Sequence, residues 1–201
     1  MAQFPSLDYN AETDVGMRQF ELLESDSYNL RYIKIQKKKR LYRSFITRVT
    51  GCTGPEADSH PLSQNITRFI YGQGNLIWQH IFAMRQILPT AGWFINYKDE
   101  LPPIIQYKLK YDTYTNDIAA KMTHGHLKLQ AMIKEKTFAG VSELTDIPMA
   151  TLKNMFRFVQ SAYGYIKFHS PPNYANMQIL SNFGINPQLW FIMEDEKIKE
   201  N

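Results

Sequence analysis

Six cations lie within one short stretch of the chain, and residues of this type bind polyanions. The segment from Gln36 to Gly51, QKKKRLYRSFITRVTG, contains no acidic residue. Lysine and arginine side chains neutralise phosphates and release the counterions of DNA, whatever its base sequence. The candidate DNA-binding residues of this stretch are Lys37, Lys38, Lys39, Arg40, Arg43 and Arg48.

The apolar residues of the same stretch predict the element that would carry these cations. Leu41, Phe45 and Val49 recur every four residues, so they follow one stripe of an α-helix. We therefore predict a basic helix over 37–50, ended by Gly51, with its apolar face in a core and its cations outward. The alternative is an ordinary solvated helix with long basic side chains.

A second set of polar residues follows the spacing of a helix-turn-helix. Ser142 is predicted to cap a short helix over 143–146, IPM to form a turn, and residues 150–160 to form a second helix. The side chains predicted to point outward from this second helix are Lys153, Asn154, Arg157 and Gln160, and the first three are the candidate DNA contacts. GYIKF (164–168) is predicted to be a strand, and HSPPNYANMQI (169–179) a hairpin or wing. The alternative is an ordinary corner between two helices with a polar outer face.

The rest of the pattern predicts a mainly α fold. Further helices are predicted over 11–25, over 63–88 as one or two helices with Ser63 as N-cap, and over 103–134. A turn or short helix is predicted at 26–36 and a loop at 51–63. We predict an N-terminal helical domain over 1–112, which contains the basic helix. The second domain, over 113–201, is predicted to be a helix-turn-helix or winged-helix-like region with a small β-hairpin.

Composition restricts the class of protein. The chain has 201 residues, 44% of them apolar, with a formal net charge of +4. A single cysteine, Cys52, allows no internal disulfide and suits a reducing compartment. The sequence shows neither a run of eighteen apolar residues nor a signal peptide, so we expect a cytoplasmic protein without a membrane partner.

Motifs of known catalytic chemistry are missing from the sequence. It has no glycine-rich phosphate loop, no nucleophile elbow and no HExxH pair. His124 and His126 are two residues apart, a spacing that does not put both on one face of a helix. We therefore expect neither an enzyme nor a cofactor or metal site.

Three stretches, in this order along the chain, resemble the FlhC family of flagellar master regulators and its relatives on conjugative elements. They are RQFELLESDS (18–27) with KKRLYRSFITRVTG (38–51), GPEADSHPLSQNITRFIYGQGN (54–75) and LKNMFRFVQSAYGYIKFHS (152–170). The sequence departs from the family by an insertion around 28–36. It also lacks the four cysteines of the family's zinc site, since HSPPNYANM contains none.

The resemblance implies a transcriptional activator subunit that acts at promoters in a hetero-oligomer. Its partners would be double-stranded DNA, a smaller regulatory subunit and RNA polymerase. The cations of 38–48 would then contact phosphates or a groove. Two other functions remain open. One is a plasmid or phage replication or partition protein, and the other is a protein-interaction module whose basic helix docks an acidic partner.

Overall fold

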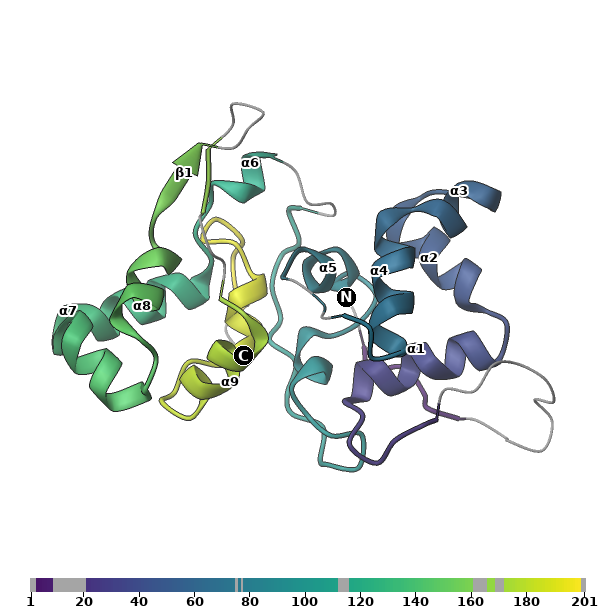
Figure 1. Ribbon diagram of the computed structural model, residues 1–201, viewed down its shortest axis with the longest axis horizontal. Helices are drawn as coiled ribbons and strands as arrows, with labels where there is room; N and C mark the ends of the chain where they lie inside the picture. Colours follow the sequence, from purple (N-terminus) through teal and green to yellow (C-terminus); the bar gives the residue numbers. More distant parts are fainter. Residues whose placement is uncertain are drawn as a thin grey trace. The chain divides into compact units, whose positions relative to one another are not determined.

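The computed structural model is mainly helical, as predicted (Figure 1). It describes residues 3–8, 21–74, 76, 78–111, 116–160, 166–168 and 172–199. The chain forms two compact units: unit 1 comprises Met1–Leu76 with Ala83–Ile104, and unit 2 comprises Ile77–Phe82 with Ile105–Asn201. The predicted domain division between residues 112 and 113 lies outside the described residues. None of the described helices has the length and apolarity needed to cross a membrane.

Unit 1 is built from short helices around an aliphatic and aromatic core. Its helices are α1 (Tyr28–Lys38), α2 (Tyr42–Thr50), α3 (Gly54–Ser59), α4 (Pro61–Ile70) and the 3-10 helix η1 (Thr90–Trp93). Ile33, Phe45 and Ile66, from three of these helices, are each no more than 1% exposed. The helices are short because caps and prolines delimit them. Ser27 caps α1, and prolines open α3 and α4.

The prediction of a single helix over 37–50 is wrong, because α1 ends at Lys38 and α2 begins only at Tyr42. Arg40 adopts a left-handed conformation with φ of 59°. This conformation ends the α-helical hydrogen-bond pattern of α1. The Leu41 amide donates to the Gln36 carbonyl at 2.8 Å, five residues earlier, where a continuing α-helix would bond four residues earlier. As a result Leu41 is 49% exposed instead of buried. The predicted burial of Phe45 and Val49 is confirmed, as is the helix end at Gly51.

Other predicted boundaries in unit 1 also need correction. Of the helix predicted over 11–25, residues 11–20 lie outside the described residues, and residues 21–25 are not helical, with a turn at 24–25. The predicted loop over 51–63 contains α3 and the start of α4. His60, not Ser63, caps α4, since its Nδ1 accepts from the Leu62 amide at 3.1 Å. Proline in the first turn favours a helix, and prolines in the first turns of α3 and α4 account for this difference.

Unit 2 contains the longest helix and the two described strands. Its elements are most of α5 (Trp78–Met84), α6 (Asn116–Ala119), α7 (His124–Thr145), α8 (Met149–Met155), β1 (Phe158–Gln160), β2 (Ile166–Phe168), α9 (Tyr174–Ser181) and the 3-10 helix η2 (Pro187–Phe191). β1 and β2 pair antiparallel, with Phe158 opposite Phe168. The centre of the unit is Trp190, whose carbonyl accepts from the Trp78 indole N–H at 2.7 Å.

Two predictions in unit 2 are wrong. Residues 103–111, predicted to be helical, form a non-helical segment beside the C-terminal residues. The Lys108 amide donates to the Lys197 carbonyl at 2.9 Å, and the Lys199 amide donates to the Gln106 carbonyl at 2.7 Å. Residues 174–179, predicted to belong to a hairpin or wing, begin α9, whose cap Asn173 accepts from the Asn176 amide at 2.8 Å.

Candidate nucleic-acid interface

Lys37, the first predicted DNA contact, binds other side chains of unit 1. Its ammonium donates to the Thr67 hydroxyl of α4 at 3.2 Å. It also lies 4.9 Å from the ring centroid of Tyr42 and 5.1 Å from that of Tyr71, within the range of cation–π attraction. Lys37 therefore links α1 to the start of α2 and to α4.

Arg43, the first of two predicted contacts on α2, forms an ion pair with Asp58 of α3. Its Nε donates to one carboxylate oxygen at 3.1 Å, and its terminal nitrogen donates to the other. The pair is exposed, so it contributes between zero and about 1 kcal/mol to stability. Its main effect is electrostatic, because Asp58 balances the charge that Arg43 would offer to a phosphate.

The other four cations of the stretch divide between two places. Lys38, Lys39 and Arg40 follow one another where α1 ends, and lysines there suit the negative end of the helix dipole. Lys39 donates to the Asp8 carbonyl at 2.5 Å. Arg48 lies on α2, is exposed, and approaches the Tyr32 hydroxyl at 3.5 Å. The six cations therefore do not all point outward from one helix, as the sequence predicted.

The second motif begins at a break within α7. Thr137 has φ of 63° and ψ of 165°, which divides the helix into 124–136 and 138–145. This backbone region is unusual for a β-branched residue. The Thr137 hydroxyl accepts from the Gly140 amide at 3.3 Å, as an N-cap does, so Thr137 starts the second half of α7.

The turn between α7 and α8 is fixed by hydrogen bonds and by one buried side chain. Ser142 was predicted to cap a helix. It lies within α7 instead, and its hydroxyl donates to the Ile147 carbonyl at 2.8 Å. The Ile147 amide donates to the Thr145 hydroxyl at 3.3 Å, and Ile147 itself is 1% exposed. The left-handed Asp146 ends α7, which leaves residues 146–148 as the connection.

The three predicted contacts of the second motif lie together on α8 and the turn after it. Leu152 and Met155 are buried, as their spacing predicted. Lys153 and Arg157 are exposed, and Asn154 is partly exposed. The predicted helix over 150–160 is too long, since α8 ends at Met155 and the chain enters β1 at Phe158.

His126, which the sequence did not single out for this motif, connects the start of α7 to α8. Its Nδ1 accepts from the Thr123 amide at 3.1 Å, and the Thr123 hydroxyl accepts from the His126 amide at 3.3 Å. This is a reciprocal cap with histidine at the position that usually holds Glu or Gln, and Thr-x-x-His was its signal in the sequence. The ring packs edge-on against Phe156 and Trp190. Burial lowers the pKa of His126 to about 4, and a hydrogen bond with the Met155 backbone opposes this shift.

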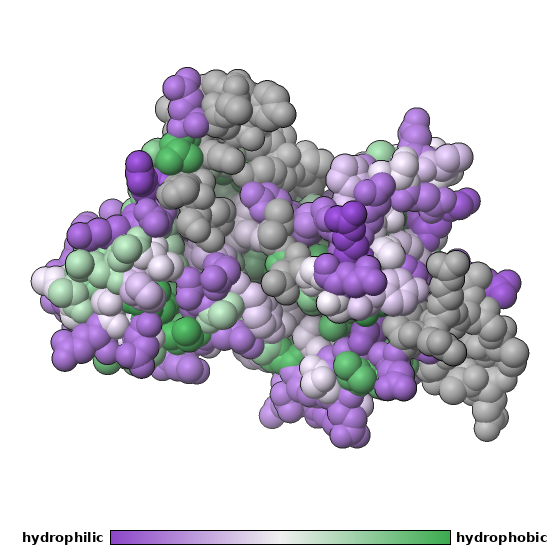
Figure 2. Space-filling model, in the orientation of Figure 1, coloured by the Kyte–Doolittle hydropathy of each residue, from purple (hydrophilic) through white to green (hydrophobic). Residues whose placement is uncertain are grey.

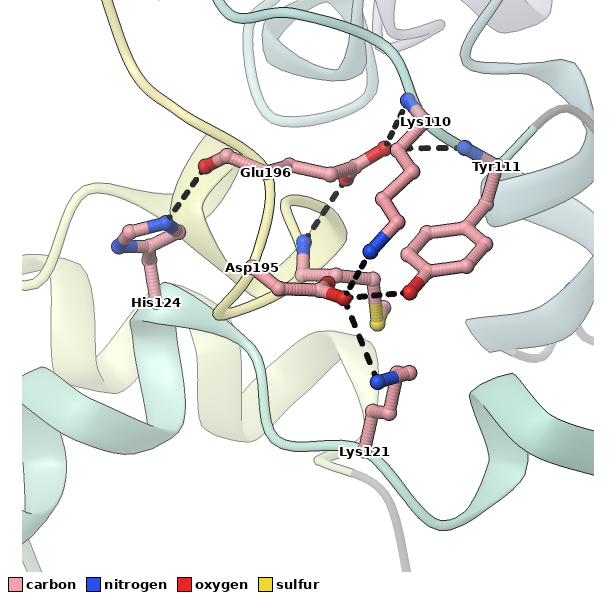
Figure 3. A network of polar contacts seen from close by, with 7 residues as sticks. Lys110, Tyr111, Lys121, His124, Asp195 and Glu196 are labelled. Atoms are coloured by element: carbon pink, nitrogen blue, oxygen red, sulfur yellow. Dashed lines mark hydrogen bonds and ion pairs between the residues drawn. The ribbon is translucent and has the colours of Figure 1, made fainter.

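A network of polar contacts holds the C-terminal segment of unit 2 (Figure 3). The Asp195 carboxylate accepts from Lys110 at 2.7 Å, from the Tyr111 hydroxyl at 2.5 Å and from Lys121 at 3.3 Å. The hydrogen bond from Lys110, followed by that from Tyr111, lowers the pKa of Asp195. The carboxylate therefore ties Lys110, Tyr111 and Lys121 to the C-terminal segment.

Glu196, next in the chain, is a buried carboxylate that binds backbone amides. One oxygen accepts from the Lys110 amide at 2.9 Å and from the Tyr111 amide at 3.3 Å, and the other accepts from the Met193 amide at 2.9 Å. Its carbonyl lies 3.0 Å from Nε2 of His124 (Figure 3). These bonds fix the extended segment around Tyr111 to the C-terminal residues and to the first turn of α7.

Metal ligands do not gather in the part of the chain that the structure describes, where no three His, Cys, Asp or Glu side chains lie close enough to hold an ion. Comparison with known proteins gives no relative: no protein-family model, curated protein or solved structure matches this chain.

Proposed function

We propose that this protein is a sequence-specific regulator of transcription that binds duplex DNA through α8. The observation that carries the proposal is the arrangement of two helices, the second half of α7 and α8, joined by a three-residue connection. The cations of α8 and of the turn after it lie on the outside. In a helix-turn-helix, the second helix enters the major groove while the first crosses the backbone. The buried Leu152 and Met155 hold α8 in place, and Lys153, Asn154 and Arg157 remain available.

The types of these three side chains suit two kinds of contact with DNA, to phosphates and to base edges. Lysine and arginine bind phosphates or the acceptor edge of guanine, and asparagine binds the adenine edge with two hydrogen bonds. The antiparallel pair β1–β2 follows α8 directly, which is where a winged helix has its wing. The exposed acids Glu143 and Asp146 precede α8, so the favourable charge for DNA is concentrated in α8 and the turn after it.

The resemblance to the FlhC family supports a further step of the proposal. We propose that the protein acts as an activator subunit, in a hetero-oligomer with a smaller partner subunit, and contacts RNA polymerase at promoters. Zinc is not part of this proposal, because the four cysteines of the family's site are absent from the sequence. In unit 1, the exposed Arg40 and Arg48 would add phosphate contacts.

Binding of a random duplex across a salt series tests the proposal. Fluorescence anisotropy of the full chain should show affinity that falls steeply as salt rises. In a variant with Lys153→Glu and Arg157→Glu, the slope of log affinity against log salt should fall by about 2, since each cation neutralises about one phosphate. Generic duplex binding should weaken at least about tenfold at 0.1 M salt.

A matched control separates a local effect from a change in net charge. Lys108→Glu with Lys199→Glu reverses two exposed lysines of the same unit outside α8, and this variant should bind like the wild type. A third variant, Arg40→Glu with Arg48→Glu, measures how much unit 1 contributes to the affinity for duplex DNA. If the α8 variant and the lysine control bind equally well, α8 is not the DNA-binding element. Absence of salt-dependent binding by the wild type would reject the proposal in favour of an interaction module.

A further inference from the structure

The outward face of α8 carries apolar groups beside its polar ones. Ala150, Lys153 and Asn154 are spaced i, i+3 and i+4, so they follow one stripe of α8 opposite the buried Leu152 and Met155, and the exposed Arg157 follows in the turn after the helix. Ala150 is exposed, and Met149 beside it is 42% exposed. Figure 2 shows apolar side chains among hydrophilic ones where α7 and α8 lie. The start of α8 thus exposes the apolar side chains of Met149 and Ala150, and hydrogen-bonding side chains follow them toward its end.

Apolar groups on a DNA-reading face have one specific use. Of the four bases, only thymine presents a methyl group in the major groove, and apolar side chains recognise it by contact. Neither Met149 nor Ala150 can bind a base edge through a side-chain N–H or O–H, so they carry no other direct base readout. The small side chain of Ala150 also lets the helix approach the base edges closely.

We infer that α8 reads a thymine through its methyl group, using Met149 and Ala150, next to the base that Asn154 contacts. This inference rests on the proposed function and specifies its target. Ala150 and Asn154 are four residues apart, which is about 6 Å along a helix. Base pairs are spaced by about 3.4 Å, so the thymine lies within roughly two base pairs of the base bound by Asn154.

Replacement of thymine by deoxyuridine tests the inference, because it removes the methyl group and keeps the base pairing. Binding sites are first selected with the full chain from a randomised duplex pool. Each thymine of a selected duplex is then replaced singly by deoxyuridine, and affinity is measured by anisotropy. The wild type should bind one such duplex about fourfold more weakly, the effect of one methyl group lost from an apolar contact.

Variants assign this effect to the residues. In the protein with Met149→Gln and Ala150→Ser, the thymine and deoxyuridine duplexes should bind equally. Leu109→Gln is the matched control, since Leu109 is 42% exposed, as Met149 is, and lies outside α7 and α8. This control should keep the fourfold difference. Circular dichroism checks that all three proteins fold, which the exposure of the substituted side chains favours.

Each contrary outcome has a distinct meaning. If the selection yields a preferred site but no thymine of it shows a penalty, the inference is overturned and DNA binding stands. The inference is equally overturned if the double variant keeps the penalty, because other residues then read the methyl group. If the wild type binds no duplex in a salt-dependent way, the proposed function itself fails.

Discussion

Acidification is expected to destabilise unit 2 through His126. The ring has a pKa of about 4 in the folded protein, against 6.5 for an ordinary histidine. Between these values the unfolded chain binds a proton that the folded protein does not, so stability is retained above pH 6.5 and is lost as the pH falls toward 4. From pH 7 to pH 5 the loss due to this residue is roughly 2 kcal/mol.

The surroundings of the ring explain why it stays neutral. The ring contacts the side chains of Thr123, Phe156 and Trp190, and none of these carries a charge that could stabilise an imidazolium. Protonation of Nδ1 would also break its hydrogen bond with the Thr123 amide, since both groups would then be donors. Because the ring packs on Phe156, which directly follows α8, its protonation should loosen the position of α8 as well.

Urea unfolding of the wild type and of His126→Gln, followed by circular dichroism at pH 5, 6 and 7, measures the effect. Glutamine suits the capping position and does not titrate, so any packing cost of the change is the same at each pH. Burial also lowers the pKa of His80, but that contribution is common to both proteins. The wild type should lose roughly 2 kcal/mol more than the variant between pH 7 and pH 5. Equal losses in the two proteins would refute the reasoning.

Three other substitutions should change stability by different amounts, each measured by urea unfolding at pH 7. A Cβ at Gly125 would lie 2.4 Å from the Trp190 ring, so Gly125→Ala should cost about 1–3 kcal/mol; a variant as stable as the wild type would show that the ring moves freely. Asp26→Asn leaves the buried Lys34 ammonium without its carboxylate at 2.6 Å and should cost about 3–5 kcal/mol, and a loss below about 1 kcal/mol would contradict this. Asp195→Asn breaks ion pairs that are more exposed to solvent and should cost less than about 1 kcal/mol. A loss as large as that of Asp26→Asn would show that the network in Figure 3 is better shielded from solvent than its exposure indicates.

Local patterns predicted those features of the fold that local forces decide. The mainly α class follows from apolar residues at helical spacing, and the burial of Phe45, Val49, Leu152 and Met155 follows from the same rule. The helix end at Gly51 was predictable because glycine adopts the left-handed conformation without strain. These features depend on residues within one or two turns of each other.

Features that depend on distant residues could not be predicted. Arg40 takes a left-handed conformation that its residue type does not favour, so nothing local marked the break between α1 and α2. The segment around Tyr107 is extended because its hydrogen-bonding partners lie near Ile198, at the other end of unit 2. For the candidate interface, residue types identified the cations. They could not show that Lys37 binds Thr67 within the protein.

The order in which the chain contributes to its two units decides how the protein can be dissected. Residues Ile77–Phe82 belong to unit 2 although unit 1 continues from Ala83 to Ile104, so the chain passes between units three times. A fragment that starts at Ile105 would lack Trp78, which bonds the Trp190 carbonyl and stacks on Phe191. Such a fragment would expose aromatic surface and aggregate. Neither laboratory truncation nor recombination between genes can therefore separate the two units by a single cut.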